Sequence, residues 1–139
     1  MSFKQEILQQ IREAFPEDRP PPRPITGHRC DECDETDRLL GGRKWRDVAV
    51  NFPQYCHDVF PLLTPEAKRY YLPAYMTVEV LSPGHMQGIS VAFSLEKGDL
   101  LPAEFDVAQR AAIRQWGRWF YRQDHTPPPF SLATTWGIR

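Results

Sequence analysis

Proline constrains the fold of this chain more than any other residue type. Fourteen of the 139 residues are proline, and more than half of them fall in clusters, the longest from Pro16 to Pro24. A proline lacks the backbone N–H and crowds the residue before it, so it ends helices and is excluded from central strands. We therefore expect helices joined by stiff, irregular connections.

Between the prolines, apolar residues recur at helical spacing behind residues that favour helix N-termini. Ser2, Thr64 and Asp106 each stand in the N-cap position of such a segment, and Pro65 takes a first helical position, where its missing N–H costs nothing. A further short helix is expected from Asp31 to Leu40, ending at a pair of glycines. These segments hold much of the apolar side-chain surface, so helix dominates the predicted fold.

The sequence predicts a mainly α protein, a compact single-domain helical bundle over residues 1–139 with long Pro-rich connections. At most a short strand or hairpin is expected near 88–96, where the apolar run GISVAFSL lies among glycines. Pro73 interrupts the apolar stripe of the helix that begins at Pro65, which predicts a bend or a division there. The tail, 125–139, is expected to be irregular but packed through its apolar residues.

Charge and hydropathy exclude several classes of protein. The formal net charge is −1, whereas proteins that bind nucleic acid through its phosphates usually carry a basic surplus. No apolar stretch approaches the roughly 20 residues that cross a bilayer. The N-terminus lacks the charged and then apolar pattern of a secretion signal, so we expect a cytoplasmic protein with reduced cysteines.

The candidate metal ligands are His28, Cys30 and Cys33, with a fourth ligand from Cys56 or His57. A C-x-x-C spacing lets two sulfurs bind one ion, and a structural zinc site needs four ligands. Such a site would join two segments that are otherwise connected by loops. The alternative is a pair of small, partly buried helix residues, because the surrounding carboxylates disfavour two bare thiolates.

An acidic run around these cysteines is the candidate partner surface. Its carboxylates could dock a basic partner, with a neighbouring aromatic residue as the apolar contact. The same carboxylates also suit the solvated first turns of a helix, where they complement the helix dipole. The candidate partner-binding residues are Asp31, Glu32, Asp34, Glu35, Asp37 and Trp45.

A basic ridge is expected on the last long helix, where arginines recur every four residues. Aromatic residues between arginines are also found in proteins that bind single-stranded nucleic acid. An amphipathic helix needs a charged outer face in any case, and the simpler interpretation is a solvated face. The ridge consists of Arg110, Arg114, Arg118 and Arg122.

Three segments carry a resemblance to a known family. They read HRCDECDE, GRKW and LLTPEAKRYYLPAYM, in this order. In these segments the chain resembles a family of small bacterial proteins known only as a domain of unknown function, which share a C-x-E-C element, a Gly-Lys-Trp-like element and a Leu-Thr-Pro-Glu-Ala…Tyr-Tyr-Leu-Pro-Ala-Tyr helix. Arg43 between the glycine and Lys44 is a minor departure. The resemblance covers about a third of the chain and implies a bacterial, cytosolic protein, but no activity or catalytic residue.

The sequence contains no complete catalytic motif, such as a P-loop, GxGxxG, GxSxG or HExxH. We therefore expect a non-catalytic protein–protein interaction module, in its most concrete form a bacterial immunity or antitoxin-type protein that binds and neutralises a toxin or effector. Two alternatives stay open. One is a zinc-stapled accessory or regulatory domain, and the other is an enzyme with an unrecognised site.

Overall fold

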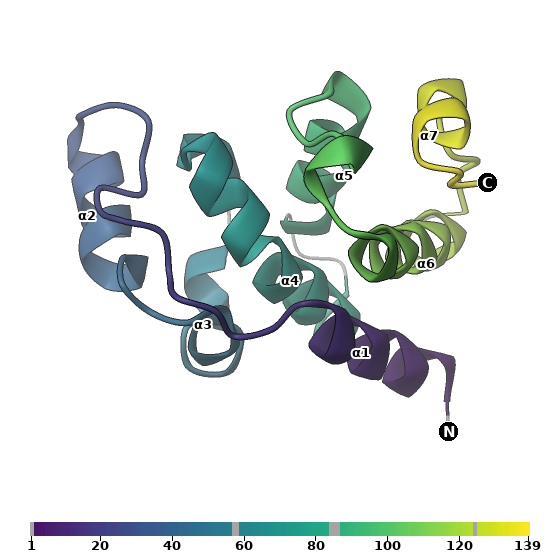
Figure 1. Ribbon diagram of the computed structural model, residues 1–139, viewed down its shortest axis with the longest axis horizontal. Coiled ribbons are helices and arrows are strands. Elements are labelled where there is room, and N and C mark those ends of the chain that lie inside the picture. Colours follow the sequence, from purple (N-terminus) through teal and green to yellow (C-terminus); the bar gives the residue numbers. More distant parts are fainter. Residues whose placement is uncertain (1, 57–58, 84–86, 124) are drawn as a thin grey trace. The chain divides into compact units, whose positions relative to one another are not determined.

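The computed structural model describes residues 2–56, 59–83, 87–123 and 125–139, apart from the side chains of residues 55–56 and 87–90. In these ranges the chain is helical and contains no strand beyond one isolated bridge, which confirms the mainly α prediction (Figure 1). The α-helices are α1 (Phe3–Ala14), α2 (Asp31–Leu40), α3 (Trp45–Asn51), α4 (Pro65–Leu81), α5 (Gln87–Lys97), α6 (Val107–Gln123) and α7 (Phe130–Thr135). Three short 3-10 helices join them: η1 (Pro53–Cys56), η2 (Phe60–Leu62) and η3 (Pro102–Glu104).

The sequence predicts at most a short strand or hairpin near 88–96. Helix α5 occupies this region instead, and no strand forms there. Val91 and Leu95 lie one helical turn apart and are both buried, whereas Phe93 between them is 55% exposed. Residues two apart would share a face in a strand, so this burial follows a helical period. The tail is also more regular than expected, because α7 begins directly after Pro129.

The chain divides into two compact units. One contains residues 17–91, and the other contains residues 1–16 together with 92–139. The division falls inside α5. The expectation of a single domain over residues 1–139 stays a prediction.

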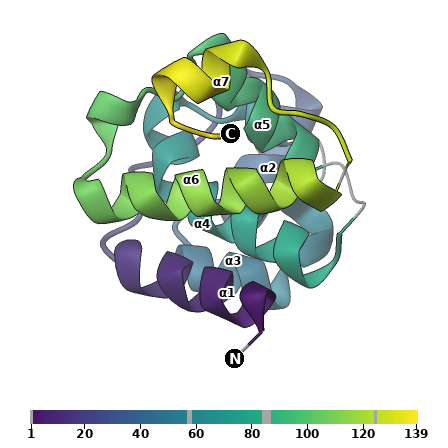
Figure 2. The same cartoon turned by 90° about the vertical axis from the view of Figure 1, so that its right-hand side faces the viewer.

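In the unit formed by residues 1–16 and 92–139, α1 packs along α6, and α6 lies between α1 and α7 (Figure 2). The predicted caps are present at both long helices. Ser2 and Gln5 form a reciprocal capping box at α1, and Asp106 and Gln109 exchange the equivalent bonds before α6. These bonds satisfy amide groups that the first helical turn leaves without partners.

The basic ridge of α6 is engaged by the protein's own backbone. Arg114 donates to the carbonyl of Trp136 at 3.1 Å, and Arg118 donates to that of Gly137 at 3.3 Å. Arg110 likewise donates to a carbonyl just before α6, at 2.5 Å. The expectation of a purely solvated face is therefore incomplete, because these three arginines hold neighbouring segments onto the helix.

In the unit of residues 17–91, α3 packs on α4, and η1 contacts both helices. Thr64 caps α4 by accepting the amide of Ala67 at 3.2 Å, as its position in the sequence predicts. The helix continues through Pro73, so of the predicted bend or division the division is wrong, whereas the bend stays a prediction. Every residue from Tyr71 to Met76 is buried, and this packing holds the helical backbone on both sides of the proline.

The segment that leads to the candidate metal ligands pairs with the start of α4. Thr26 forms an isolated antiparallel bridge with Leu63. Gly27 donates its amide to the Leu62 carbonyl at 2.9 Å, and Thr64 donates to the Ile25 carbonyl at 2.8 Å. These bonds fix the chain immediately before His28.

Candidate metal centre

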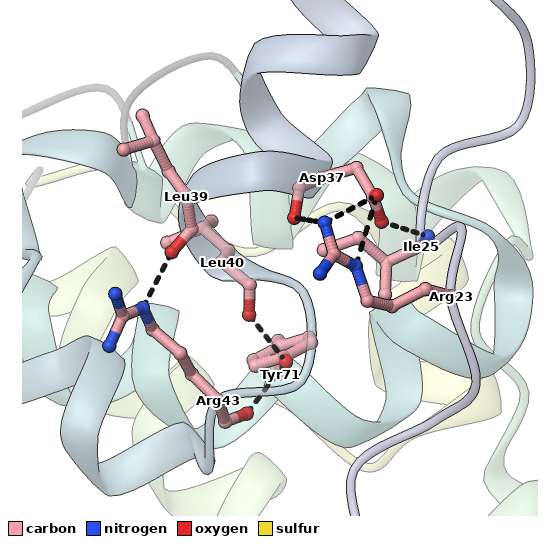
Figure 3. Close-up of polar contacts among 7 residues, drawn as sticks. All are labelled: Arg23, Ile25, Asp37, Leu39, Leu40, Arg43 and Tyr71. Carbon is pink, nitrogen blue, oxygen red and sulfur yellow. Dashed lines mark hydrogen bonds and ion pairs between the residues drawn. The ribbon is translucent and has the colours of Figure 1, made fainter.

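A polar staple fastens the end of the proline-rich segment to α2 (Figure 3). The guanidinium of Arg23 donates to one carboxylate oxygen of Asp37 at 3.1 and 2.9 Å, and to the Asp37 carbonyl at 3.0 Å. The other carboxylate oxygen accepts the amide of Ile25 at 2.9 Å. Residues 23–27 are thus held by α2 on one side and by the start of α4 on the other. No pattern in the sequence predicts this role of Arg23.

The C-terminal end of α2 is held from α4. The hydroxyl of Tyr71 lies 2.9 Å from the Leu40 carbonyl and 2.7 Å from the Arg43 carbonyl, which both accept from it (Figure 3). Arg43 in turn donates to the Leu39 carbonyl at 2.6 Å. Burial raises the pKa of Tyr71 well above its ordinary value, so this hydroxyl keeps its proton and remains a donor.

The N-terminus of α2 is formed by the two cysteines. Cys30 is the N-cap residue, and its sulfur accepts the amide of Cys33 at 3.2 Å. The helix begins at Asp31 and ends at Leu40, as predicted. Cys33 points inward and is 0% exposed, whereas Cys30 is only partly covered.

The structure brings the three predicted ligands together. The Nδ1 atom of His28 lies 3.5 Å from Sγ of Cys33, and the ligand atoms of His28, Cys30 and Cys33 all lie within 4.8 Å of one another. Tetrahedral zinc with bonds of about 2.3 Å to sulfur and about 2.0 Å to nitrogen places neighbouring ligand atoms about 3.6 Å apart. The cluster is therefore within metal-binding distance with only small side-chain adjustments.

Without a bound cation, the surroundings of the cluster favour protonated thiols. The hydrogen bond with the Cys30 side chain, burial and the charge of Cys30 all raise the pKa of Cys33, and nearby Glu32 adds to this effect. Thiol ligands must lose their protons to bind a metal, so this environment works against a bare thiolate pair. A divalent cation supplies the positive charge that stabilises both thiolates.

The predicted fourth ligand falls outside the described side chains. His57 lies outside the described residues altogether, and of Cys56 only the backbone, at the end of η1, is described. Among the side chains that the structure does place, the cluster has three members. The choice between Cys56 and His57 stays a prediction.

The candidate partner surface is smaller than expected. Asp37 is occupied by the staple and its side chain is 19% exposed, so it is not available to a partner in this conformation. Trp45 is 3% exposed at the start of α3, where its amide donates to the hydroxyl of Tyr70, so its ring is covered in this conformation and its use as a partner contact stays a prediction. The exposed carboxylates are those of Asp31, Glu32, Asp34 and Glu35, the last of which pairs with Arg38 at 2.8 Å.

Within the described ranges, none of the helices combines the length and the apolar character that crossing a membrane requires. No protein-family model, no curated protein and no solved structure matches this chain. The resemblance to small bacterial proteins of unknown function therefore stays a prediction.

Proposed function

We propose that this protein is a non-catalytic interaction module built on a structural zinc centre. The observation that carries the proposal is the convergence of His28, Cys30 and Cys33, whose ligand atoms lie within 4.8 Å of one another. Two cysteines and a histidine are a ligand set that zinc prefers, and Cys56 or His57 would complete the coordination.

The zinc would fix the N-terminus of α2 relative to the segment before it. His28 belongs to the segment that is paired with the start of α4, whereas Cys30 caps α2 and Cys33 lies in its first turn. One ion bound to all three residues would join these parts of the unit. Because the binding energy of a structural zinc is also folding energy, the centre would stabilise α2 as a fixed surface element.

That surface element would present carboxylates to a basic partner. Asp31, Glu32, Asp34 and Glu35 are exposed in the first turns of α2. Clustered negative charge steers a basic protein and speeds its association, even where the net charge of the whole chain is only −1. The specific function we propose is that of an immunity-type protein, which binds and neutralises a basic toxin or effector.

The zinc centre is tested by the metal content of protein purified without an affinity tag and by replacing the metal with cobalt. We expect one metal ion per chain and a cobalt spectrum with thiolate charge-transfer bands. Cys30→Ser should lose the metal and several kcal/mol of stability. Serine is itself a favourable N-cap, so this variant should be no less stable than the wild type once both are treated with a chelator.

That comparison separates the metal from the helix cap. Protein that binds neither zinc nor cobalt in stoichiometric amounts would overturn the zinc centre. A cobalt complex without thiolate bands would overturn the assignment of Cys30 and Cys33 as ligands.

The interaction surface is tested on a partner recovered from native lysate or from a neighbouring gene. Reversing Asp31, Glu32, Asp34 and Glu35 to lysine should slow association steeply at low ionic strength. Three of these residues lie in the first turn of α2, where lysines oppose the helix dipole, so circular dichroism first checks that the variant is folded. A matched control reverses Glu96 and Asp99, which are exposed carboxylates outside α2. If the association rate changes neither with the α2 reversal nor with the ionic strength, the partner binds at another surface.

A further inference from the structure

Cys30 and Cys33 are placed as a dithiol as well as a ligand pair. Their sulfur atoms lie within 4.8 Å of each other, at the first turn of one helix. Residues three apart in a helical turn have Cα atoms about 5 Å apart, inside the range of about 4.4–6.8 Å that a disulfide spans. A disulfide between them therefore needs rotation of the side chains but no movement of α2.

The two sulfurs differ in access. Cys30 is partly exposed at the helix N-cap, and Cys33 is 0% exposed behind it. An oxidant from solution can therefore reach Cys30 but not Cys33. A reactive outer cysteine beside a buried inner one is the arrangement of sites in which the inner thiol resolves a bond made at the outer one.

We propose that Cys30 and Cys33 form a reversible disulfide with each other. Low-molecular-weight disulfides of the glutathione class act as the oxidant, and formation of the bond releases the metal. The release of metal rests on the function proposed above, whereas the dithiol rests on the geometry of the two cysteines alone. Zinc holds both sulfurs as thiolates, and a disulfide leaves neither of them as a ligand.

The reaction proceeds in two exchanges. The Cys30 thiolate attacks one sulfur of glutathione disulfide, whose S–S bond breaks, and the first glutathione leaves as a thiolate. The Cys33 thiolate then attacks Sγ of Cys30, forms the intramolecular bond and expels the second glutathione thiolate. Two electrons pass from the cysteine pair to glutathione disulfide, and Zn²⁺ leaves with its charge balanced by the two glutathione thiolates.

Oxidation would change the element that carries the acidic face. Two contacts lie at the start of α2. One is the N-cap bond from the Cys33 amide to Cys30, and the other joins the Cys33 sulfur to His28. Loss of the metal removes the link to His28, so α2 would be tied to the preceding segment chiefly through Arg23 and Asp37. The proposed partner surface would then depend on the redox state of this pair.

The experiment equilibrates zinc-loaded wild-type protein with mixtures of reduced and oxidised glutathione. Free thiols, intact mass, peptide maps and released zinc are measured together. We expect Cys30 and Cys33 to lose their thiols in step, the mass to fall by two hydrogen atoms, one zinc ion to appear per disulfide, and dithiothreitol to reverse the change.

Two variants test the order of attack. Cys33→Ser should stop at a mixed disulfide on Cys30, and Cys30→Ser should leave Cys33 unmodified because it is buried. If either variant fails to fold, the wild-type peptide map after brief exposure still shows which cysteine carries glutathione first.

The outcomes separate the two proposals. Zinc-loaded protein whose Cys30 and Cys33 stay reduced, or stop at glutathione adducts, would overturn the dithiol and leave the zinc centre standing. A reversible disulfide in protein that never binds metal would support the dithiol and overturn the zinc centre.

Discussion

Asp37 accepts hydrogen bonds from the Arg23 side chain with one carboxylate oxygen and from the backbone amide of Ile25, 2.9 Å away, with the other. This arrangement makes Asp37 a structural residue in a run of otherwise exposed carboxylates. The ion pair alone adds little, because the Arg23 side chain is half exposed. The bond to Ile25 matters more, since that residue is fully buried and its amide would lose its acceptor.

Asp37→Ala is therefore expected to lower the free energy of unfolding by about 1–3 kcal/mol, the cost of leaving buried donors without a partner. It should also weaken zinc binding, because residues 23–27 position His28. Urea unfolding with and without zinc measures both effects. Glu35→Ala is the matched control, because its exposed pair with Arg38 should contribute at most about 1 kcal/mol. Equal losses in the two variants would contradict the structural role of Asp37.

Gly41 adjoins the same staple and leaves no room for a side chain. A Cβ atom there would lie 2.5 Å from the Asp37 carbonyl oxygen and 2.7 Å from Nε of Arg23. Gly41→Ala should therefore lower stability by about 1–3 kcal/mol, as overpacking does. Gly27→Ala is the control, since its Cβ would meet nothing closer than the Leu62 carbonyl oxygen at 3.8 Å. Thermal unfolding of both variants checks the prediction, and an unaffected Gly41→Ala would contradict it.

The helix starts and the cluster of His28, Cys30 and Cys33 were predictable because their signals are local. Caps at Ser2, Thr64 and Asp106 follow from side chains that reach an amide three residues ahead. The C-x-x-C spacing likewise implies that Cys30 and Cys33 share one helical turn. His28 joins them because it lies two residues before Cys30.

Other roles were not predictable, because they depend on contacts between distant segments. Nothing near Trp45 in the sequence distinguishes an exposed aromatic from one covered at the start of α3. The role of Asp37 depends on Arg23, fourteen residues earlier in a proline-rich stretch. Helix α5 was missed because its glycine and β-branched residues lower local helix propensity, and packing overrides that preference.

Tyr71 supports a prediction about alkaline pH. Burial raises its pKa in the folded state above the ordinary value of 10.0, so its contribution is fully present below pH 10 and is lost as the pH rises further. The unfolded chain then releases a proton that the folded chain retains. For this one group the free energy of unfolding should fall by up to about 1.4 kcal/mol per pH unit above pH 10.

Tyr71→Phe should remove that part of the pH dependence. It should also cost about 1–3 kcal/mol at neutral pH, because the carbonyls of Leu40 and Arg43 lose their shared donor. Burial also raises the pKa of Tyr70, so this residue contributes to the same fall of stability with pH. The difference in slope between Tyr70→Phe and the wild type measures that contribution. Urea unfolding between pH 8 and pH 11 gives the slopes, and an unchanged slope in Tyr71→Phe would count against the assignment.

The last prediction concerns the other unit, where Gly117 of α6 lets the C-terminal tail approach the helix. A Cβ atom on Gly117 would lie 2.6 Å from Cδ1 and 3.0 Å from Cγ1 of Ile138, which is fully buried. Alanine favours a helix over glycine by about 1 kcal/mol, so Gly117→Ala should stabilise the protein if the tail can move. We expect the opposite sign, because the Arg114 and Arg118 bonds to the Trp136 and Gly137 carbonyls hold the tail in place.

Gly117→Ala should therefore lower stability by about 1–2 kcal/mol. Ile138→Val removes Cδ1, and in a double-mutant cycle it should restore part of the loss, with a coupling of at least about 0.5 kcal/mol. Additive effects in that cycle, or a more stable Gly117→Ala, would show that the tail is not fixed against α6.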